Sequence, residues 1–223
     1  MITLDNARKI VLSNCAKMPG VEVDPRLAFG LTLADSANAL IDVPAFANSA
    51  MDGYAVIASD VAGAPVKLRV VGTILAGPVT SRSDALRVTQ GCAIRVMTGA
   101  PIPDGADSVV MVERTTTSPD GTEVTIDHPV AQGEHVRNPG EDVRVGSEVL
   151  PAGSVVGASQ IGALVSAGIQ GVRVHSRPRV GVLSTGDELV DLGSVLADGQ
   201  IFDSNRPMLV AMVNDSGCTA VDL

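Results

Sequence analysis

The chain has 223 residues, of which 45% are hydrophobic and 18% charged, a composition typical of a folded globular protein rather than a disordered one. Its net charge of −9 argues against nucleic-acid binding, because holding phosphate backbones requires a basic surface. No stretch reaches the roughly 18 apolar residues of a membrane-spanning helix, so we expect no membrane partner and a cytoplasmic protein. The three cysteines, Cys15, Cys92 and Cys218, are widely spaced, which predicts buried free thiols in a reducing compartment.

The chain opens with a helix signal. Leu4, Ala7 and Val11 recur at helical spacing directly after Thr3, a residue type that caps helices. Pro19-Gly20 predicts the end of this segment.

From residue 54 to about residue 127 the pattern is that of β-strands. Leu68 and Val70 alternate with Lys67 and Arg69, as in a strand that is buried on one face. Turn-forming residues separate the apolar runs, so we expect a compact, barrel-like all-β unit.

The pattern changes after residue 178. A short apolar strand at 179–183 precedes a helix that Ser204 can cap, and a second strand begins at Thr219. The buried stripe of this helix is predicted to be Leu209, Met212 and Val213. Two parallel strands cannot form a sheet covered on both faces, so we expect the chain to be a piece of a longer protein.

Two polar loops next to strands are candidate functional segments. One is Pro44-Ala-Phe-Ala-Asn-Ser-Ala-Met-Asp-Gly-Tyr-Ala-Val56, and the other is Arg95-Val-Met-Thr-Gly-Ala-Pro-Ile-Pro-Asp-Gly-Ala-Asp107. Loops on a rigid β-scaffold can present backbone amides and small polar side chains to a ligand.

These loops and three later motifs occur in the order found in one family. The later motifs are Gly140-Glu-Asp142, Ser184-Thr-Gly-Asp-Glu-Leu189 and Asp203-Ser-Asn205. Together they resemble the molybdopterin molybdenumtransferase family, which includes MoeA and the gephyrin E-domain. The resemblance extends from about Leu4 to Leu223 and covers the N-terminal portion of the family's sequence.

The resemblance implies an elongated, multidomain, mixed α/β fold. A discontinuous α+β linker and dimerisation domain would comprise residues 1–43 and 143–176, with a small all-β barrel-like domain inserted at 44–142. Residues 177–223 would begin a three-layer α/β molybdopterin-binding domain. The family's final small β-domain would lie outside this chain.

The resemblance also implies an activity in molybdenum cofactor biosynthesis. The family inserts molybdate into adenylylated molybdopterin with Mg²⁺ and releases AMP, and it works as a homodimer. Other cofactor-pathway proteins, such as molybdopterin adenylyltransferase, would be further partners. We expect the 223-residue chain alone to be inactive, because the family's cationic anion-binding residues lie beyond Leu223.

Candidate site residues follow from the matched motifs. The resemblance implies catalytic roles for Asp52, Asp142 and Glu188, and a Mg²⁺ site formed by Asp187 and Glu188. The substrate-binding candidates are Asn48, Ser49, Thr98, Gly99, Ser184, Thr185, Gly186, Asp203 and Asn205. From the residues alone Asp52, Thr98, Gly99, Asp187 and Glu188 are more typical of turns, caps and solvated loops than of a site, whereas Asp203 and Asn205 fit a helix cap as well as a pocket.

Two other interpretations stay open at this point. One is a non-catalytic, gephyrin-like scaffold or dimerisation module, which is favoured slightly by Ala47 at a position where the family usually has Asp. The other is a molybdopterin- or nucleotide-binding domain of another class. It accounts for the motifs after residue 184 but leaves the first 176 residues unexplained.

Overall fold

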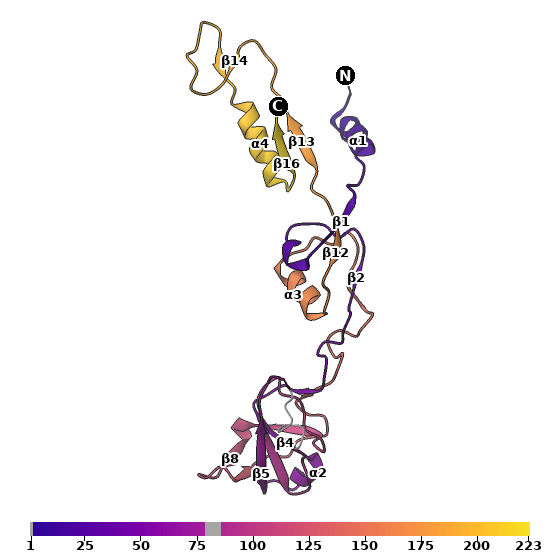
Figure 1. Cartoon of the computed structure of the whole chain (residues 1–223), viewed down its shortest axis with the longest axis vertical. Helices are drawn as coiled ribbons and strands as arrows, with labels where there is room; N and C mark the ends of the chain where they lie inside the picture. Colours follow the sequence, from indigo (N-terminus) through magenta and orange to yellow (C-terminus); the bar gives the residue numbers. More distant parts are fainter. Residues whose placement is uncertain (1, 79–85) are drawn as a thin grey trace. The chain divides into compact units, whose positions relative to one another are not determined.

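A computed structural model describes residues 2–78 and 86–223 and shows a mixed α/β fold, as expected (Figure 1). The chain forms two compact units, one composed of Met1–Ala37 with Glu148–Leu223 and the other of Asn38–Ser147. The separation of 177–223 as a domain of its own stays a prediction.

The first unit begins with helix α1, Leu4–Asn14, which is N-capped by the Thr3 hydroxyl. None of the residues of α1 is buried, and its large apolar side chains, Leu4, Ile10, Val11 and Leu12, are exposed. The expectation of three buried thiols is therefore wrong for Cys15, which follows this helix and is exposed. Cys92 is buried and Cys218 is only partly buried.

The middle of the first unit is built around an antiparallel pair. Strand β1, Gly20–Val23, pairs with β12, Val172–His175. Helix α3 packs near the 3₁₀ helix η1 and ends before Gly168, whose φ of +77° is the left-handed conformation expected after a helix. The remaining bounds here are η1 Pro25–Leu27, β2 Ala37–Asn38, β11 Glu148–Leu150 and α3 Ala158–Ser166.

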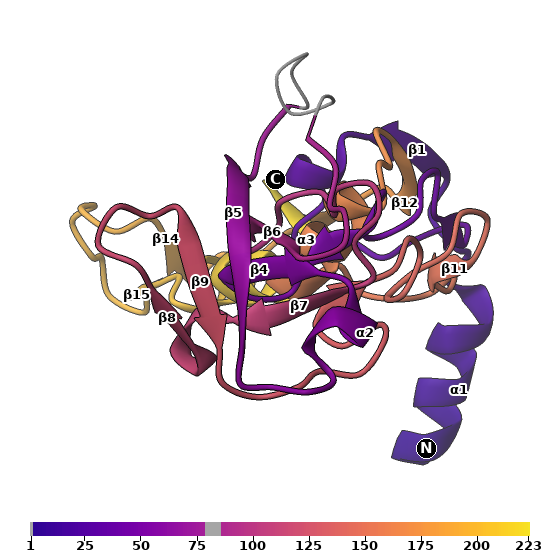
Figure 2. The same ribbon diagram turned by 90° about the horizontal axis from the view of Figure 1, so that it is seen from below.

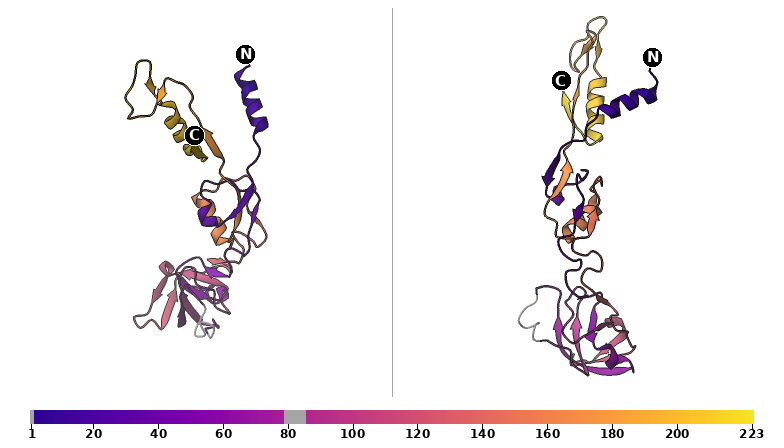
Figure 3. Two further views of the ribbon diagram at one scale, coloured as in Figure 1. Left: turned by 45° about the horizontal axis from the view of Figure 1, so that its top comes forward. Right: turned by 90° about the vertical axis from the view of Figure 1, so that its right-hand side faces the viewer.

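The C-terminal part contains the predicted βαβ arrangement. Strand β13, Arg179–Val182, runs parallel to β16, Thr219–Asp222, and helix α4, Asn205–Asp215, connects into β16. Figure 3 shows α4 in yellow along these strands. A second parallel pair, β14 (Leu189–Val190) with β15 (Ile201–Phe202), lies between β13 and α4 in the chain.

Ser204 is the N-cap residue of α4, as predicted, but its side chain makes no capping bond. The carboxylate of Asp203 instead accepts a hydrogen bond from the backbone N–H of Arg206 at 3.0 Å. The prediction of a buried stripe on α4 is wrong. Leu209 and Met212 are exposed and Val213 is only partly buried. The physical reason is that a two-stranded sheet is too narrow to cover the whole apolar face of the helix.

The second unit contains a six-stranded sheet of order β7-β4-β6-β5-β9-β8 (Figure 2). Its strands are β4 Gly53–Val56, β5 Val66–Ile74, β6 Cys92–Val96, β7 Ser108–Met111, β8 Thr115–Thr117 and β9 Glu123–Ile126. The unit also contains β3 Asn48–Ser49, β10 Val136–Arg137, helix α2 Ala58–Val61 and the 3₁₀ helix η2 Val112–Arg114.

The connection between β7 and β8 shows that this sheet curls. These strands lie at the two edges, yet only the three residues of η2 join them. Such a link can span at most about 14 Å, because each residue extends about 3.5 Å. The edges of a flat six-stranded sheet would be about 24 Å apart. The sheet therefore bends toward closure, in keeping with the barrel-like unit expected from the sequence.

Strand β4 is the centre of the hydrophobic core. All four of its residues are buried, and successive side chains face two different apolar clusters. Tyr54 packs in the cluster with Leu68 and Val124, whereas Ala55 packs in the cluster with Ile94. This double burial gives the loop that precedes β4 a rigid base.

Candidate functional site

The two polar loops predicted from the sequence lie together in the second unit. Oδ1 of Asp52 accepts hydrogen bonds from the backbone N–H and the hydroxyl of Thr98, both at 2.7 Å. The backbone N–H of Gly99 donates to the Ser49 carbonyl at 2.8 Å. The antiparallel pairing of β4 with β6 causes this juxtaposition, since Asp52 precedes β4 and Thr98 follows β6.

The hydrogen bonds from Thr98 stabilise the ionised form of the Asp52 side chain. The backbone N–H of Thr98, followed by its hydroxyl, lowers the pKa of Asp52 below 3.8, and the positive charge of Arg95 acts in the same direction. The side chain is therefore ionised at neutral pH. An exposed, oriented carboxylate of this kind can bind a cation or accept hydrogen bonds from a substrate.

The side chains of Asn48 and Ser49 shape the loop from inside. Both residues are buried. The Asn48 amide donates to the Phe46 carbonyl at 3.0 Å, and the Ser49 hydroxyl donates to the Met51 carbonyl at 2.6 Å. These hydrogen bonds stabilise the conformation of the loop. The predicted contact of Asn48 and Ser49 with substrate stays a prediction.

Asp142 is connected to the same loop through an arginine. Arg137 donates to the carboxylate of Asp142 at 2.5 Å, and Arg137 pairs with Asn48 in the β10–β3 ladder. The backbone N–H of Asp142 donates to the Val43 carbonyl. Asp142 is thus linked to the Asn48–Asp52 segment through its hydrogen bond with Arg137 and the strand pairing of Arg137 with Asn48.

His135 also braces this loop, and the sequence interpretation did not include it. Its carbonyl accepts from the Ala50 N–H at 2.9 Å, and its ring nitrogen Nδ1 lies 2.9 Å from the Val109 carbonyl. Its φ is +59°, an unusual value for a residue other than glycine. The signal in the sequence was weak, because an isolated histidine among turn residues indicates no specific geometry.

A cavity of about 350 Å³ lies where β13 ends in the first unit. Three predicted substrate-binding residues, Ser184, Gly186 and Asp203, line this cavity. Its other lining residues are Leu189, Val190, Asp191, Ser194, Arg206 and Leu223. Thr185, Asp187, Glu188 and Asn205 lie outside this lining, although all four belong to the same two motifs.

Asp203 is held tightly in this cavity. Its pKa is lowered below 3.8, first by the hydrogen bond from the Arg206 backbone, then by bonds from the Ser184 hydroxyl and the Arg206 side chain. Arg206 was not among the predicted site residues. Nothing in the local sequence indicates that the side chain of an arginine directly after the Asp-Ser-Asn motif will contact the aspartate of that motif.

Asp187 and Glu188 are exposed on the loop beside the cavity. A methyl group added to Gly186 would approach Oε2 of Glu188 to 2.5 Å, so the Glu188 carboxylate folds over this glycine. The φ of Gly186 is +155°, which also disfavours a side chain there. Among residues 2–78 and 86–223 no group of three or more His, Cys, Asp or Glu side chains is arranged to hold a metal. The Mg²⁺ role of Asp187 and Glu188 stays a prediction.

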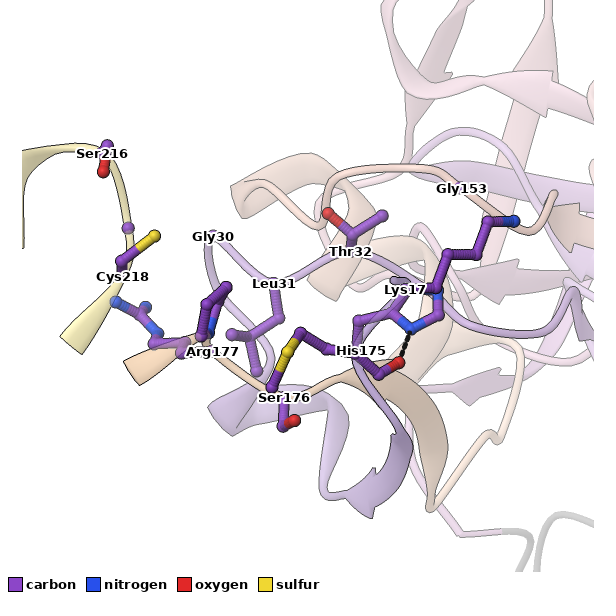
Figure 4. A pocket seen from close by; sticks show the side chains of 13 residues that line it. Lys17, Gly30, Leu31, Thr32, Gly153, His175, Ser176, Arg177, Ser216 and Cys218 are labelled. Atoms are coloured by element: carbon purple, nitrogen blue, oxygen red, sulfur yellow. Dashed lines mark hydrogen bonds between the residues drawn. The ribbon is translucent and has the colours of Figure 1, made fainter. Parts of the chain in front are cut away.

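A larger cavity, of about 450 Å³, lies elsewhere in the first unit (Figure 4). Its lining includes Lys17, Arg177 and Cys218, together with His175, whose Nδ1 bonds to the Met18 carbonyl. It contains none of the residues predicted for the site.

Comparison with known proteins identifies the family. Residues 2–168 match the family described as the MoeA N-terminal region (domain I and II). The chain belongs to the MoeA family. It is 43% identical over 198 residues to molybdopterin molybdenumtransferase 2 of Mycobacterium tuberculosis H37Rv, a match that covers 87% of this chain and 47% of that protein. It is 37% identical over 231 residues to the molybdopterin molybdenumtransferase of Haemophilus influenzae, covering 100% of this chain and 54% of that protein.

Solved structures show the same relationship. The crystal structure of the MoeA protein from Pyrococcus horikoshii OT3 matches with a TM-score of 0.87 and 32% identity, covering 100% of this chain and 59% of that chain. The chain spans about half the length of the curated relatives it matches. Within the described part of the chain, no helix is both long and apolar enough to cross a membrane.

Proposed function

We propose that this MoeA chain acts in molybdenum cofactor biosynthesis as part of a molybdopterin molybdenumtransferase, which inserts molybdate into adenylylated molybdopterin and releases AMP. The observation that carries the proposal is the cavity at the end of β13, lined by Ser184, Gly186 and Asp203 from two family motifs. Its position agrees with the general rule that open α/β sheets bind ligands at the carboxyl ends of their strands. The 43% identical relative carries the corresponding name.

The loop after β13 is suited to an anionic, phosphorylated ligand. Ser184 and Thr185 carry hydroxyl groups, and Gly186 lets the backbone approach a ligand closely because it has no side chain. A nucleophilic role for Ser184 is not part of the proposal, because the three histidines of the chain, His128, His135 and His175, lie outside the matched motifs.

The exposed carboxylates of Asp187 and Glu188 fit a Mg²⁺ that is shared with the substrate. Mg²⁺ is usually bound by one or two protein carboxylates, with substrate oxygens and water completing the octahedron. Such an ion neutralises charge on a phosphoanhydride. In this proposal Asp187 and Glu188 would hold the ion, which would neutralise charge on the phosphoanhydride of the substrate.

The Asp52 loop of the second unit would complete the site in a homodimer. Asp52, with Thr98 and Gly99 beside it, would reach the neighbouring protomer's pocket, and Asp142 would act from the same unit through Arg137. The exposed apolar side chains of α1 support a partner surface, because exposed apolar clusters are typical of interfaces. We place this dimer in the cytoplasm, in contact with cofactor-pathway proteins such as molybdopterin adenylyltransferase.

Ligand titration tests the proposal. The protein translated from its whole reading frame is titrated with adenylylated molybdopterin, with Mg²⁺ and with EDTA, and binding is followed by pterin fluorescence. We expect saturable binding that Mg²⁺ strengthens and that Glu188→Gln weakens at least tenfold. Glu123→Gln, an exposed change on β9, is the matched control and should bind as the wild type does. A folded protein that binds nothing at millimolar ligand contradicts the proposal and favours the scaffold interpretation.

A further inference from the structure

Arg206, in the first turn of α4, lies at the centre of three carboxylates. Its Nε donates to Oδ2 of Asp203 at 3.1 Å, and one terminal nitrogen donates to Oδ1 of Asp222 at 3.1 Å. Its other terminal nitrogen pairs with Asp191. The backbone N–H of Arg206 occupies the second oxygen of Asp203 at 3.0 Å. One residue thus binds both oxygens of Asp203 and one oxygen of each neighbouring carboxylate.

These carboxylates belong to the ends of different strands. Asp191 directly follows β14, Asp203 directly follows β15, and Asp222 is the last residue of β16. The backbone N–H of Ile201 in β15 donates to the Glu188 carbonyl at 2.8 Å, so the end of the loop that follows β13 is bonded to the β14–β15 pair. The β13–β16 pair and the β14–β15 pair form two separate sheets. Arg206 therefore connects the carboxyl ends of both sheets at the cavity.

The three ion pairs of Arg206 are expected to differ in how much they stabilise the fold. The Asp203 side chain is 6% exposed and that of Arg206 is 27% exposed, so this pair is the most shielded from water. Charge-assisted hydrogen bonds of this kind are the strong ones. Asp191 and Asp222 are mostly exposed, and such pairs contribute little individually. The geometry needs three donors in a fixed plane, which an arginine supplies and a lysine does not.

We propose that Arg206 is a positioning residue that fixes the Ser184–Glu188 loop by tying the ends of the two small sheets together through Asp203. Asp203 then has a structural role at the cavity, because both of its carboxylate oxygens already accept hydrogen bonds from Arg206. The lowered pKa of Asp203 agrees with this arrangement. The inference rests on the proposed function only for the claim that the loop it fixes binds the substrate.

Hydrogen–deuterium exchange on the 223-residue chain without ligand tests the proposal. In Arg206→Gln we expect at least tenfold faster exchange of the amides of Ile201 and Asp203, which bond to Glu188 and Val190 respectively. Amides of the β1–β12 pair serve as the internal reference and should not change. Arg26→Gln, which removes an exposed arginine paired with Asp24, is the matched control and should leave all of these rates unchanged.

Arg206→Lys separates the shape of the guanidinium from its charge. The proposal expects Arg206→Lys to exchange nearly as fast as Arg206→Gln, because one ammonium cannot bridge three carboxylates at once. Wild-type exchange in Arg206→Lys overturns the proposal, and so does equal acceleration in the β1–β12 pair, which indicates general destabilisation. If Arg206→Gln does not fold, Asp203→Asn removes the charge of the most shielded pair and should give a smaller acceleration at the same amides; unchanged rates there overturn the proposal.

The same experiment distinguishes this inference from the proposed function. In the wild-type protein from the whole reading frame, adenylylated molybdopterin should protect amides 184–188 from exchange. Absence of that protection contradicts the proposed function and leaves the ligand-free result of the variants intact. Conversely, normal protection combined with wild-type exchange in Arg206→Gln contradicts the positioning role alone.

Discussion

Gly53 is the position where the close approach of two strands should make a single methyl group costly. A Cβ built on Gly53 would lie 2.0 Å from the Val110 carbonyl oxygen, whereas ordinary contacts begin at 3.4 Å. The two strands would therefore have to separate by about 1.4 Å at this point, the difference between those two distances. This shift would disturb β4, the strand buried on both faces, and its pairing with β7.

We expect Gly53→Ala to lower the free energy of unfolding by about 3 kcal/mol, at the upper end of the usual cost of overpacking a core. Urea unfolding followed by circular dichroism measures this change. Gly63→Ala is the matched control, because a Cβ there meets nothing within 4 Å. It should change stability by less than about 1 kcal/mol. Equal midpoints for the two variants would refute the close-packing argument.

Three further predictions concern hydrogen bonds. Tyr54→Phe removes the 2.7 Å bond between the buried tyrosine hydroxyl and Thr117, and should cost about 1 kcal/mol in urea unfolding. Adding Thr117→Val to that variant should cost little more; full additivity would show that the bond contributes nothing. Thr98→Val should raise the pKa of Asp52, measured by carboxyl NMR titration, while the remaining backbone bond keeps it below 3.8. Because this pKa is lower in the folded state, ionised Asp52 stabilises the fold fully at pH values well above 3.8. This stabilisation is lost as the pH falls through the folded pKa. Thr98→Val should therefore reduce the amount of stability that the protein loses in acid. Ser204→Ala should leave the unfolding midpoint unchanged, because Ser204 makes no capping bond, and a clear loss would contradict the assignment of the cap to Asp203.

Local patterns in the sequence were sufficient for the elements themselves. The Thr3 cap of α1 and the strands between 54 and 127 follow from residue type and spacing, and the structure contains them. Burial was harder to predict, because it depends on what packs against an element. Cys15, Leu209 and Met212 were expected inside the protein and are exposed.

In the candidate site, too, the local motifs were predictable from the sequence, whereas the contacts between distant segments were not. The motifs predicted Asp52 and Thr98 as site residues, and the β4–β6 pairing places these two residues in contact, whereas their functional roles stay predictions. No spacing rule could assign Arg206 to Asp191 and Asp222, since these residues come together only through the parallel strands and α4. Networks of side chains from distant segments are a property of the tertiary fold.

The most direct test of the central claim is turnover. The protein translated from its whole reading frame is mixed with adenylylated molybdopterin, Mg²⁺ and molybdate, and AMP release and molybdenum bound to the pterin are measured together. We expect one AMP released per molybdenum inserted, with both lost in Glu188→Gln. A correctly folded protein that releases no AMP and inserts no molybdenum would contradict the assignment of this chain to a molybdenum-inserting transferase.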